Sequence, residues 1–179
     1  MVPQNPFEPP KTEPSTALPD SADLSHEEVF AFVGRNGTYY WDRWRGVAPG
    51  KMNAGFNVGA FFLSVIWLAY RRLYRELGVA VAILVGLGLL QGVLDFAAPD
   101  AARAVDRVTN IAFAVTFGMM GNGLYLRRAR AEIAIARRDE SDPDRRLQRI
   151  AAAGGPNLFG AIGCAVVLLG LGVAAVAVS

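Results

Sequence analysis

The chain has 179 residues, 53% of them hydrophobic, and its 18 basic and 16 acidic residues leave a net charge of +2. So small a charge, on arginines dispersed among acids, argues against a nucleic-acid-binding protein. The apolar residues collect in long runs and the charged residues lie before or between them. This segregation is foreign to a water-soluble core and indicates an integral membrane protein.

Residues 1–24 contain six prolines among Ser, Thr, Asp and Glu. Too few apolar side chains are present to offset the entropy of ordering this stretch, so we expect a disordered Pro-rich cytoplasmic tail. It shows no basic start followed by an apolar stretch, as a signal peptide would. Membrane insertion is therefore expected to use an internal span.

Residues 25–50 are predicted to form an amphipathic helix that carries aromatic and basic residues. Ser25 followed by Glu28 makes a capping box at its start, and Gly34 and Gly37 are places where it can break into two pieces. Aromatic side chains beside arginines suit a helix lying in the lipid headgroup layer. A helix packed on the rest of the protein explains the pattern equally well.

Four apolar runs follow within a helical membrane domain over residues 51–179. The first, residues 56–70, reaches only about 22 Å as a helix, against a hydrocarbon core of about 30 Å. Residues 77–98, 108–126 and 156–178 are each long enough to span. We therefore predict an all-α integral membrane protein with three transmembrane helices plus one short apolar helix, half-inserted or a fourth spanning helix.

The connector between the second and third of these runs begins at Pro99, with Asp100 as an N-cap for the next helix. The connector after the third run, residues 127–153, contains eight arginines and is expected to face the cytoplasm. The region before Phe56 is also basic and prefers the cytoplasm. Both regions can lie in the cytoplasm only if residues 56–70 enter and leave the membrane on the same face, or lie in its interface. The alternative is that residues 56–70 cross the membrane and the N-terminus lies outside.

Two groups of residues are candidates for contacts with lipid or with neighbouring helices. At the membrane interface, aromatic anchoring or recognition of anionic headgroups is predicted for Tyr40, Trp41, Trp44, Tyr70, Arg71, Arg72, Tyr74 and Arg75. Helix packing is predicted for Gly88, Gln91, Gly92, Asp95, Asn110, Asn122 and Tyr125, with Asn57 as a cap of the first apolar helix.

Asp95 is the one carboxylate inside a predicted span, which makes it a candidate for proton-linked function. It lies near the outer end, roughly 27 Å of helix from Leu77, where water reaches it. We expect a structural or capping role, with Gln91 one turn earlier sharing a hydrogen bond across a helix interface. Gly88 and Gly92 form a GxxxG pair beside them.

Three motifs resemble one known family: FVGxNxxYY at residues 32–40, FNxxAFFxxxxWLAYRRxY at 56–74, and GNxLY at 121–125. The chain from about Phe30 to Gly155 resembles the bacterial inner-membrane family called domain of unknown function 2628. One departure is Val58, where tryptophan is usual. The resemblance implies an integral inner-membrane protein and brings no activity, ligand or catalytic residue with it.

Enzyme chemistry is not expected. His26 is the only histidine and Cys164 the only cysteine, so the sequence offers no HExxH motif, no Ser-His-Asp set, and no thiolate or histidine metal site. We therefore expect no cofactor and no metal. The favoured interpretation is an accessory or scaffold protein of the bacterial inner membrane, with lipids and other membrane proteins, or further copies of itself, as partners; the alternative is a subunit of an oligomeric small transporter or channel.

Overall fold

The computed structural model describes residues 24–178, and every regular element in that range is helical. In chain order these elements are α1 (His26–Val33), the 3₁₀ turn η1 (Gly34–Asn36), α2 (Gly37–Trp44), α3 (Val58–Tyr70), α4 (Tyr74–Ala97), α5 (Pro99–Asp139), α6 (Pro143–Ala153) and α7 (Leu158–Val178). The predicted all-α fold is confirmed. The predicted disordered tail lies outside the described residues except for Leu24.

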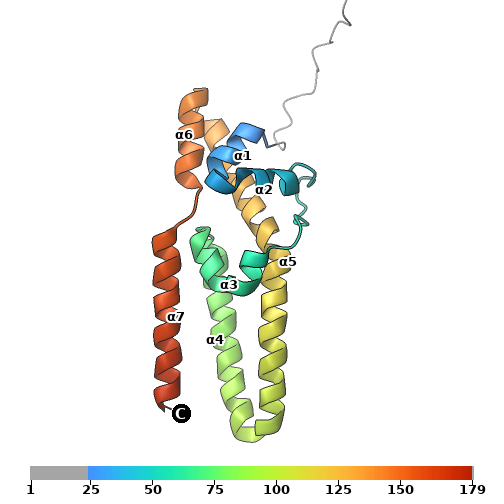
Figure 1. Cartoon of the computed structure of the whole chain (residues 1–179), viewed down its shortest axis with the longest axis vertical. Coiled ribbons are helices and arrows are strands. Elements are labelled where there is room, and N and C mark those ends of the chain that lie inside the picture. The colour runs from blue at the N-terminus through green and yellow to red at the C-terminus, as the bar shows by residue number, and fades with distance from the viewer. Residues whose placement is uncertain (1–23, 179) are drawn as a thin grey trace, which may run out of the picture.

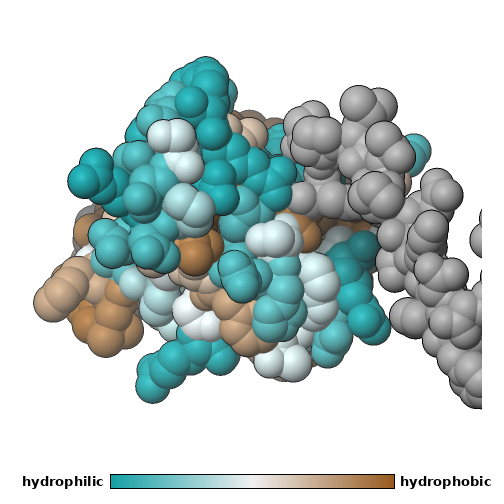
Figure 2. All heavy atoms as spheres, turned by 90° about the horizontal axis from the view of Figure 1, so that it is seen from above, coloured by the Kyte–Doolittle hydropathy of each residue, from teal (hydrophilic) through white to brown (hydrophobic). Residues whose placement is uncertain are grey.

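The molecule has two parts that follow each other along its longest axis (Figure 1). We call the first part the cap; it consists of α1, η1, α2, the loop after α2 (residues 45–57), α6 and residues 122–139 of α5. From the cap, α4, the first part of α5 and α7 run to the opposite end, where the described chain also ends. Viewed down this axis, the cap end presents mainly hydrophilic residues (Figure 2).

Helices α1 and α2 form a bent pair at the start of the described chain. The Glu28 N–H donates to the Ser25 hydroxyl oxygen and the Ser25 N–H donates to the Glu28 carboxylate, both at 3.2 Å, so the capping box is present. The helix then breaks at Gly34, whose φ of +74° favours glycine. After η1, α2 packs back against α1.

Helix α3 does not run straight across the molecule. Ser64 has non-helical angles (φ 41°, ψ −111°), and there the helix turns back on itself (Figure 1). Its start is bonded to α5 at Gly118, through Asn57 N–H at 2.7 Å, and the residue after its end contacts Tyr125. These two α5 positions are only about 10 Å apart along the helix axis. The two ends of α3 therefore lie close to each other along α5.

The turn between α4 and α5 is tighter than predicted. Residues 98–107 were expected to form a connector, but α5 begins at Pro99 and continues unbroken to Asp139. The prediction of Asp100 as N-cap is wrong, because Ala98 holds that position and provides no side-chain cap. Proline suits the first helical position, since its fixed φ is helical and its missing N–H needs no partner there.

Helix α6 lies in the cap, and α7 runs from the cap toward the opposite end of the molecule (Figure 1). Asp142 caps α6 by accepting from the Arg145 N–H at 2.8 Å, with Pro143 in the first turn and Gly154 after the last. Asn157 then accepts from the Gly160 N–H at 3.0 Å at the start of α7. These are the start and stop signals that the sequence carries.

Two of the described helical stretches are long and apolar enough to cross a membrane: Tyr74–Ala97, and Pro143–Ala174, which contains most of α7. Val58–Tyr70 is a shorter apolar helix. The sequence predicted three spans, and residues 108–126 do not reach the same hydropathy, because Asn110, Thr116 and Asn122 interrupt the run. Composition therefore does not show that residues 108–126 form a membrane span.

Candidate functional site

A buried aromatic cluster lies where α3, α5 and the cap meet, with Tyr125 at its centre. Tyr125 is 0% exposed. Four rings surround it, with centroid distances of 5.3 Å to Phe32, 5.1 Å to Tyr40, 5.4 Å to Trp44 and 6.2 Å to Trp67. Each such pair stabilises by about 0.5 to 1.5 kcal/mol beyond burial. The cluster therefore holds together segments from α1, α2, α3 and α5.

Arg71 extends this aromatic cluster with a buried cation that is only 4% exposed. Its guanidinium carbon lies 4.8 Å from the Tyr125 ring centroid, 5.0 Å from that of Tyr40 and 5.1 Å from that of Tyr70. One guanidinium nitrogen also donates to the Tyr125 hydroxyl at 3.5 Å. Aromatic faces thus replace water around this cation. Burial raises the pKa of the Tyr40 phenol to about 12, although the Arg71 cation opposes that shift.

Asn122 fastens the loop before α3 to α5. It is 0% exposed, and its amide nitrogen contacts the carbonyls of Ala54 and Gly55 at 3.2 Å each and that of Phe56 at 3.4 Å. Its oxygen accepts from the Asn57 amide at 2.7 Å. The predicted packing role of Asn122 and Tyr125 against a neighbouring segment agrees with these contacts.

Asn57 and two glycines complete this junction. The Asn57 oxygen accepts from the Ala60 N–H at 2.8 Å, so Asn57 caps α3. A Cβ atom at Gly121 would lie 2.6 Å from that of Ala60, and one at Gly123 would collide with the Met52 carbonyl. The glycines of this stretch therefore permit the close approach of α3 and the preceding loop to α5.

Within the cap, an ion pair between a buried carboxylate and an arginine joins α1 to α5. Arg137 donates to both Glu28 carboxylate oxygens, at 2.8 Å and 2.5 Å, and the Glu28 side chain is 7% exposed. Burial alone would raise the pKa of Glu28, but the bonds from Arg137 and Ser25 outweigh it and hold that pKa below its usual value. Glu28 is therefore a carboxylate at neutral pH.

Two arginines have a role that the sequence did not reveal. Arg128 donates to the carbonyls of Arg71, Arg72 and Ala153, and Arg130 donates to those of Val47 and Ala48. The sequence predicts these arginines only as positive charge on the cytoplasmic side. They in fact satisfy carbonyls at the ends of α3, α6 and the loop after α2, a pairing that has no local sequence signal.

The residues predicted to meet lipid are divided by their burial. Tyr40, Trp44 and Arg71 are 2%, 1% and 4% exposed, so they pack inside the protein and do not face headgroups. This corrects the interfacial interpretation for these three residues and favours the alternative, a packed N-terminal helix. The other members of the group are partly or fully accessible: Trp41, Tyr70, Arg72, Tyr74 and Arg75.

The predicted contact between α4 and α5 exists and includes Gln91, as expected, but it does not include the two glycines. Gln91 donates to Asp95 at 3.3 Å and to the Ala102 carbonyl of α5 at 3.0 Å. Gly88 and Gly92 have no described atom within 4 Å of the place a Cβ would take. The glycine pair therefore does not provide close approach to α5, and the packing face instead contains Ala80, Leu84 and Gln91.

Asn110 was predicted to meet the α4 stripe at the same depth. It is exposed, and its amide donates to Asp106 of the same helix at 3.0 Å. Asp95 is exposed as well and accepts only from Gln91 among the described residues. Asp95 thus takes part in a local hydrogen bond close to the α4–α5 turn, as a structural role requires.

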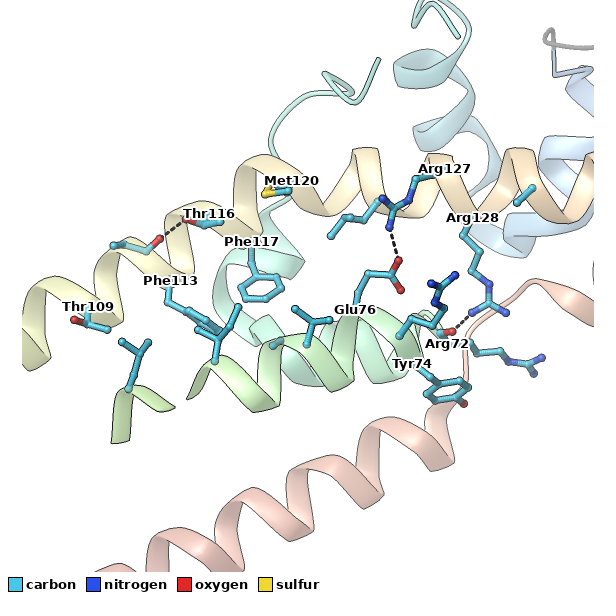
Figure 3. Close-up of a pocket in the computed structure, with 18 of the residues that line it drawn as sticks. Arg72, Tyr74, Glu76, Thr109, Phe113, Thr116, Phe117, Met120, Arg127 and Arg128 are labelled. Carbon is cyan, nitrogen blue, oxygen red and sulfur yellow. Dashed lines mark hydrogen bonds and ion pairs between the residues drawn. The ribbon is translucent and has the colours of Figure 1, made fainter. Parts of the chain in front are cut away.

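A groove of about 1040 Å³ runs between α4 and α5 (Figure 3). Arginines and glutamates line it near the cap, where Glu76, Arg127 and Arg128 are seen, and Phe113 and Phe117 line it farther away. Arg127 pairs with Glu76 at 2.6 Å. The groove is therefore charged at the cap end and apolar farther from the cap. Within residues 24–178, no three His, Cys, Asp or Glu side chains are grouped so as to hold a metal ion.

A comparison with protein families gives one match. The family model described as "Protein of unknown function (DUF2628)" matches residues 20–130, which include α1 to α4 and most of α5. Helices α6 and α7 lie beyond the matched range. No curated protein and no solved structure matches the chain.

Proposed function

Because this chain belongs to the DUF2628 family, whose description assigns no function, we propose from its own structure that it is an inner-membrane accessory or scaffold protein of bacteria. In this proposal the apolar helices anchor the chain and the cap meets a partner protein. The single observation that carries it is the pairing of a tightly bonded cap with helices whose apolar side chains are left uncovered.

The uncovered side chains support the membrane part of the proposal. Only 6% of the most apolar window of α4 is buried, and the same is true of the second apolar stretch. Phe96 is 94% exposed and Phe159 is 89% exposed. A core helix of a soluble protein would bury such side chains, whereas lipid covers them without cost.

A third crossing by α5 is part of the proposal. Residues 108–126 run antiparallel to α4, which is apolar enough to span, and the two helices lie side by side (Figure 1). Val108, Ile111 and Met119 are 67%, 65% and 64% exposed, so α5 also presents an apolar outer face. A helix at this depth needs lipid or protein around it.

The proposed orientation puts the cap in the cytoplasm. The arginine-rich connector and the N-terminal helices lie at the same end of the molecule, because α3 turns back instead of crossing. The positive-inside rule then applies to both without conflict. The α4–α5 turn and the end of α7 face the opposite compartment.

Labelling of single cysteines tests this topology. Asp100→Cys and Ser141→Cys, each in a Cys164→Ala background, are treated in intact cells with an impermeant thiol reagent. Residue 100 is expected to be labelled and residue 141 only after permeabilisation. Labelling of residue 141 in intact cells would reverse the orientation.

The scaffold role is tested by affinity capture from solubilised membranes with mass spectrometry. The intact protein is expected to bring down a defined partner, and Asn122→Leu, which loosens the cap, is expected to lose it while staying in the membrane. Val93→Leu, a mild change at an exposed position of α4, serves as the control. Recovery of only this chain in both variants would count against scaffolding.

A further inference from the structure

We propose that the α4–α5 groove binds one anionic phospholipid from the cytoplasmic leaflet, with its headgroup at the arginine end and an acyl chain along the apolar part. This inference rests on the membrane placement proposed above. The groove lies on the outer side of the helix pair, where lipid would reach it, since Val79, Ile83 and Val108 line it and are 62%, 49% and 67% exposed.

The charges at the cap end favour an anion. Four arginines (residues 72, 75, 127 and 128) and two glutamates (76 and 132) line this end, which leaves two positive charges in excess. Each glutamate already has an arginine partner: Glu76 lies 2.6 Å from Arg127, and Glu132 lies 3.8 Å from Arg128. Arg72 and Arg75 have no carboxylate partner within the described chain.

The bonds that these arginines do make leave their charge in place. Arg72 donates to the Ala152 carbonyl at 3.0 Å, which holds the side chain without neutralising it. The Nε donors of Arg72 and Arg128 are buried and have no acceptor among the described residues. Helix α4 begins here without a side-chain cap, which adds the positive end of its dipole. A phosphate group supplies the negative charge that this end of the groove lacks.

The rest of the groove matches a hydrocarbon chain in length and polarity. From Arg75 to Leu87 α4 rises about 18 Å, close to the roughly 15 Å thickness of one leaflet's hydrocarbon layer. Phe113, Phe117 and Met120 line the opposite wall from α5 (Figure 3). The hydroxyl of Thr116 donates to the Ala112 carbonyl at 2.7 Å, so it presents no unpaired donor to the acyl chain of the lipid.

A second copy of this chain is a less suitable occupant of the groove. It would bring its own arginine-rich connector to the same depth of the membrane, and like charges would face each other. An anionic lipid brings the opposite charge. The charge at the cap end therefore decides in favour of lipid.

Native mass spectrometry of the detergent-purified full chain tests the proposal, with phosphatidylglycerol, phosphatidylcholine and glycerol phosphate as separate additives. One phosphatidylglycerol is expected to be retained, and to raise the melting temperature, in clear preference to the other two. Equal retention of phosphatidylcholine, stabilisation by glycerol phosphate alone, or a dimer without lipid would overturn the proposal.

Two matched pairs of variants locate the site. Arg75→Gln is expected to weaken phosphatidylglycerol retention about fivefold, as one arginine near an anionic surface predicts, and Arg145→Gln on the exposed face of α6 is expected to leave it unchanged. Ala112→Trp, which fills the groove, is expected to abolish retention, whereas Val115→Trp on the same helix outside it is not.

The melting temperature without lipid shows whether each variant folds. A folded Arg75→Gln or Ala112→Trp variant with unchanged phosphatidylglycerol retention would contradict the site. Extraction of membranes with carbonate separates this failure from failure of the proposed function. A protein that leaves the membrane refutes the placement itself, whereas a resident protein without anionic preference refutes only the lipid site.

Discussion

The contacts that stabilise the interior of the cap differ from those that stabilise the α4–α5 hairpin. In the cap, side chains far apart in the sequence form buried polar bonds, such as the 2.7 Å bond between Asn57 and Asn122. In the hairpin, polar links between the helices lie at its two ends: the 2.6 Å pair of Glu76 with Arg127 beside the cap, and the bond from Gln91 to the Ala102 carbonyl near the turn. The cap thus completes its own interior, while the hairpin leaves apolar surface for lipid or a partner to cover.

This difference explains where stability and adaptability reside. A buried polar group costs free energy whenever its partner is lost, so the cap tolerates few alternative arrangements. Helices packed mainly by apolar side chains do not carry that penalty. Substitutions in the two regions should therefore differ in effect, and the predictions below run from the largest effect to the smallest.

The largest loss is expected from Asn122→Leu. Leucine has nearly the same size but leaves the Asn57 amide and the carbonyls of the loop before α3 without their buried partner, which costs about 3 kcal/mol of unfolding free energy. Thermal unfolding in detergent measures it. Asn110→Leu, at an exposed position of the same helix, should change stability by less than about 0.5 kcal/mol. Equal effects of the two variants would remove the distinction between cap and hairpin.

A smaller loss, about 2 kcal/mol, is expected from Glu28→Gln. Glutamine keeps the bond to the Ser25 N–H but loses the charge that faces Arg137. Glu27→Gln changes the neighbouring carboxylate, which is exposed, and should have little effect. Unfolding by heat at pH 7 distinguishes the two, and similar melting temperatures would show that the ion pair contributes nothing.

The same ion pair predicts how stability depends on pH. Because the folded state lowers the pKa of Glu28 below its usual 4.5, its contribution is fully present above about pH 4.5 and is lost as the pH falls through the lower folded value. The melting temperature of the unmodified protein should fall more steeply on acidification than that of Glu28→Gln. Parallel curves would contradict this sign.

Local signals in the sequence predicted the helices better than their arrangement. The pair Ser25 and Glu28 and the cap Asn57 are start signals that act within one turn, and the structure contains both. The course of α3 depends on Ser64, where no glycine or proline marks a turn, so periodicity could not separate a crossing from a return.

The buried cluster was beyond reach for a different reason. Arg71 and Tyr125 are 54 residues apart, and the sequence shows an aromatic residue beside an arginine without showing whether lipid or protein surrounds them. The same composition therefore predicted an interfacial belt where the structure has a packed interior. Only the family resemblance grouped these motifs, and it did so without giving their contacts.

The smallest effect is expected from Gly88→Leu and Gly92→Leu, although the GxxxG spacing predicts a tight helix interface. No described atom lies within 4 Å of the added Cβ at either position, so leucine should fit and even gain helix propensity. Ala80 is 3% exposed in the face that packs on α5, so Ala80→Leu should cost about 1 to 3 kcal/mol by overpacking. Melting temperatures of the three variants in detergent test this. A marked loss for either glycine variant together with tolerance of Ala80→Leu would mean that the hairpin packs, or associates with another chain, through the glycine face.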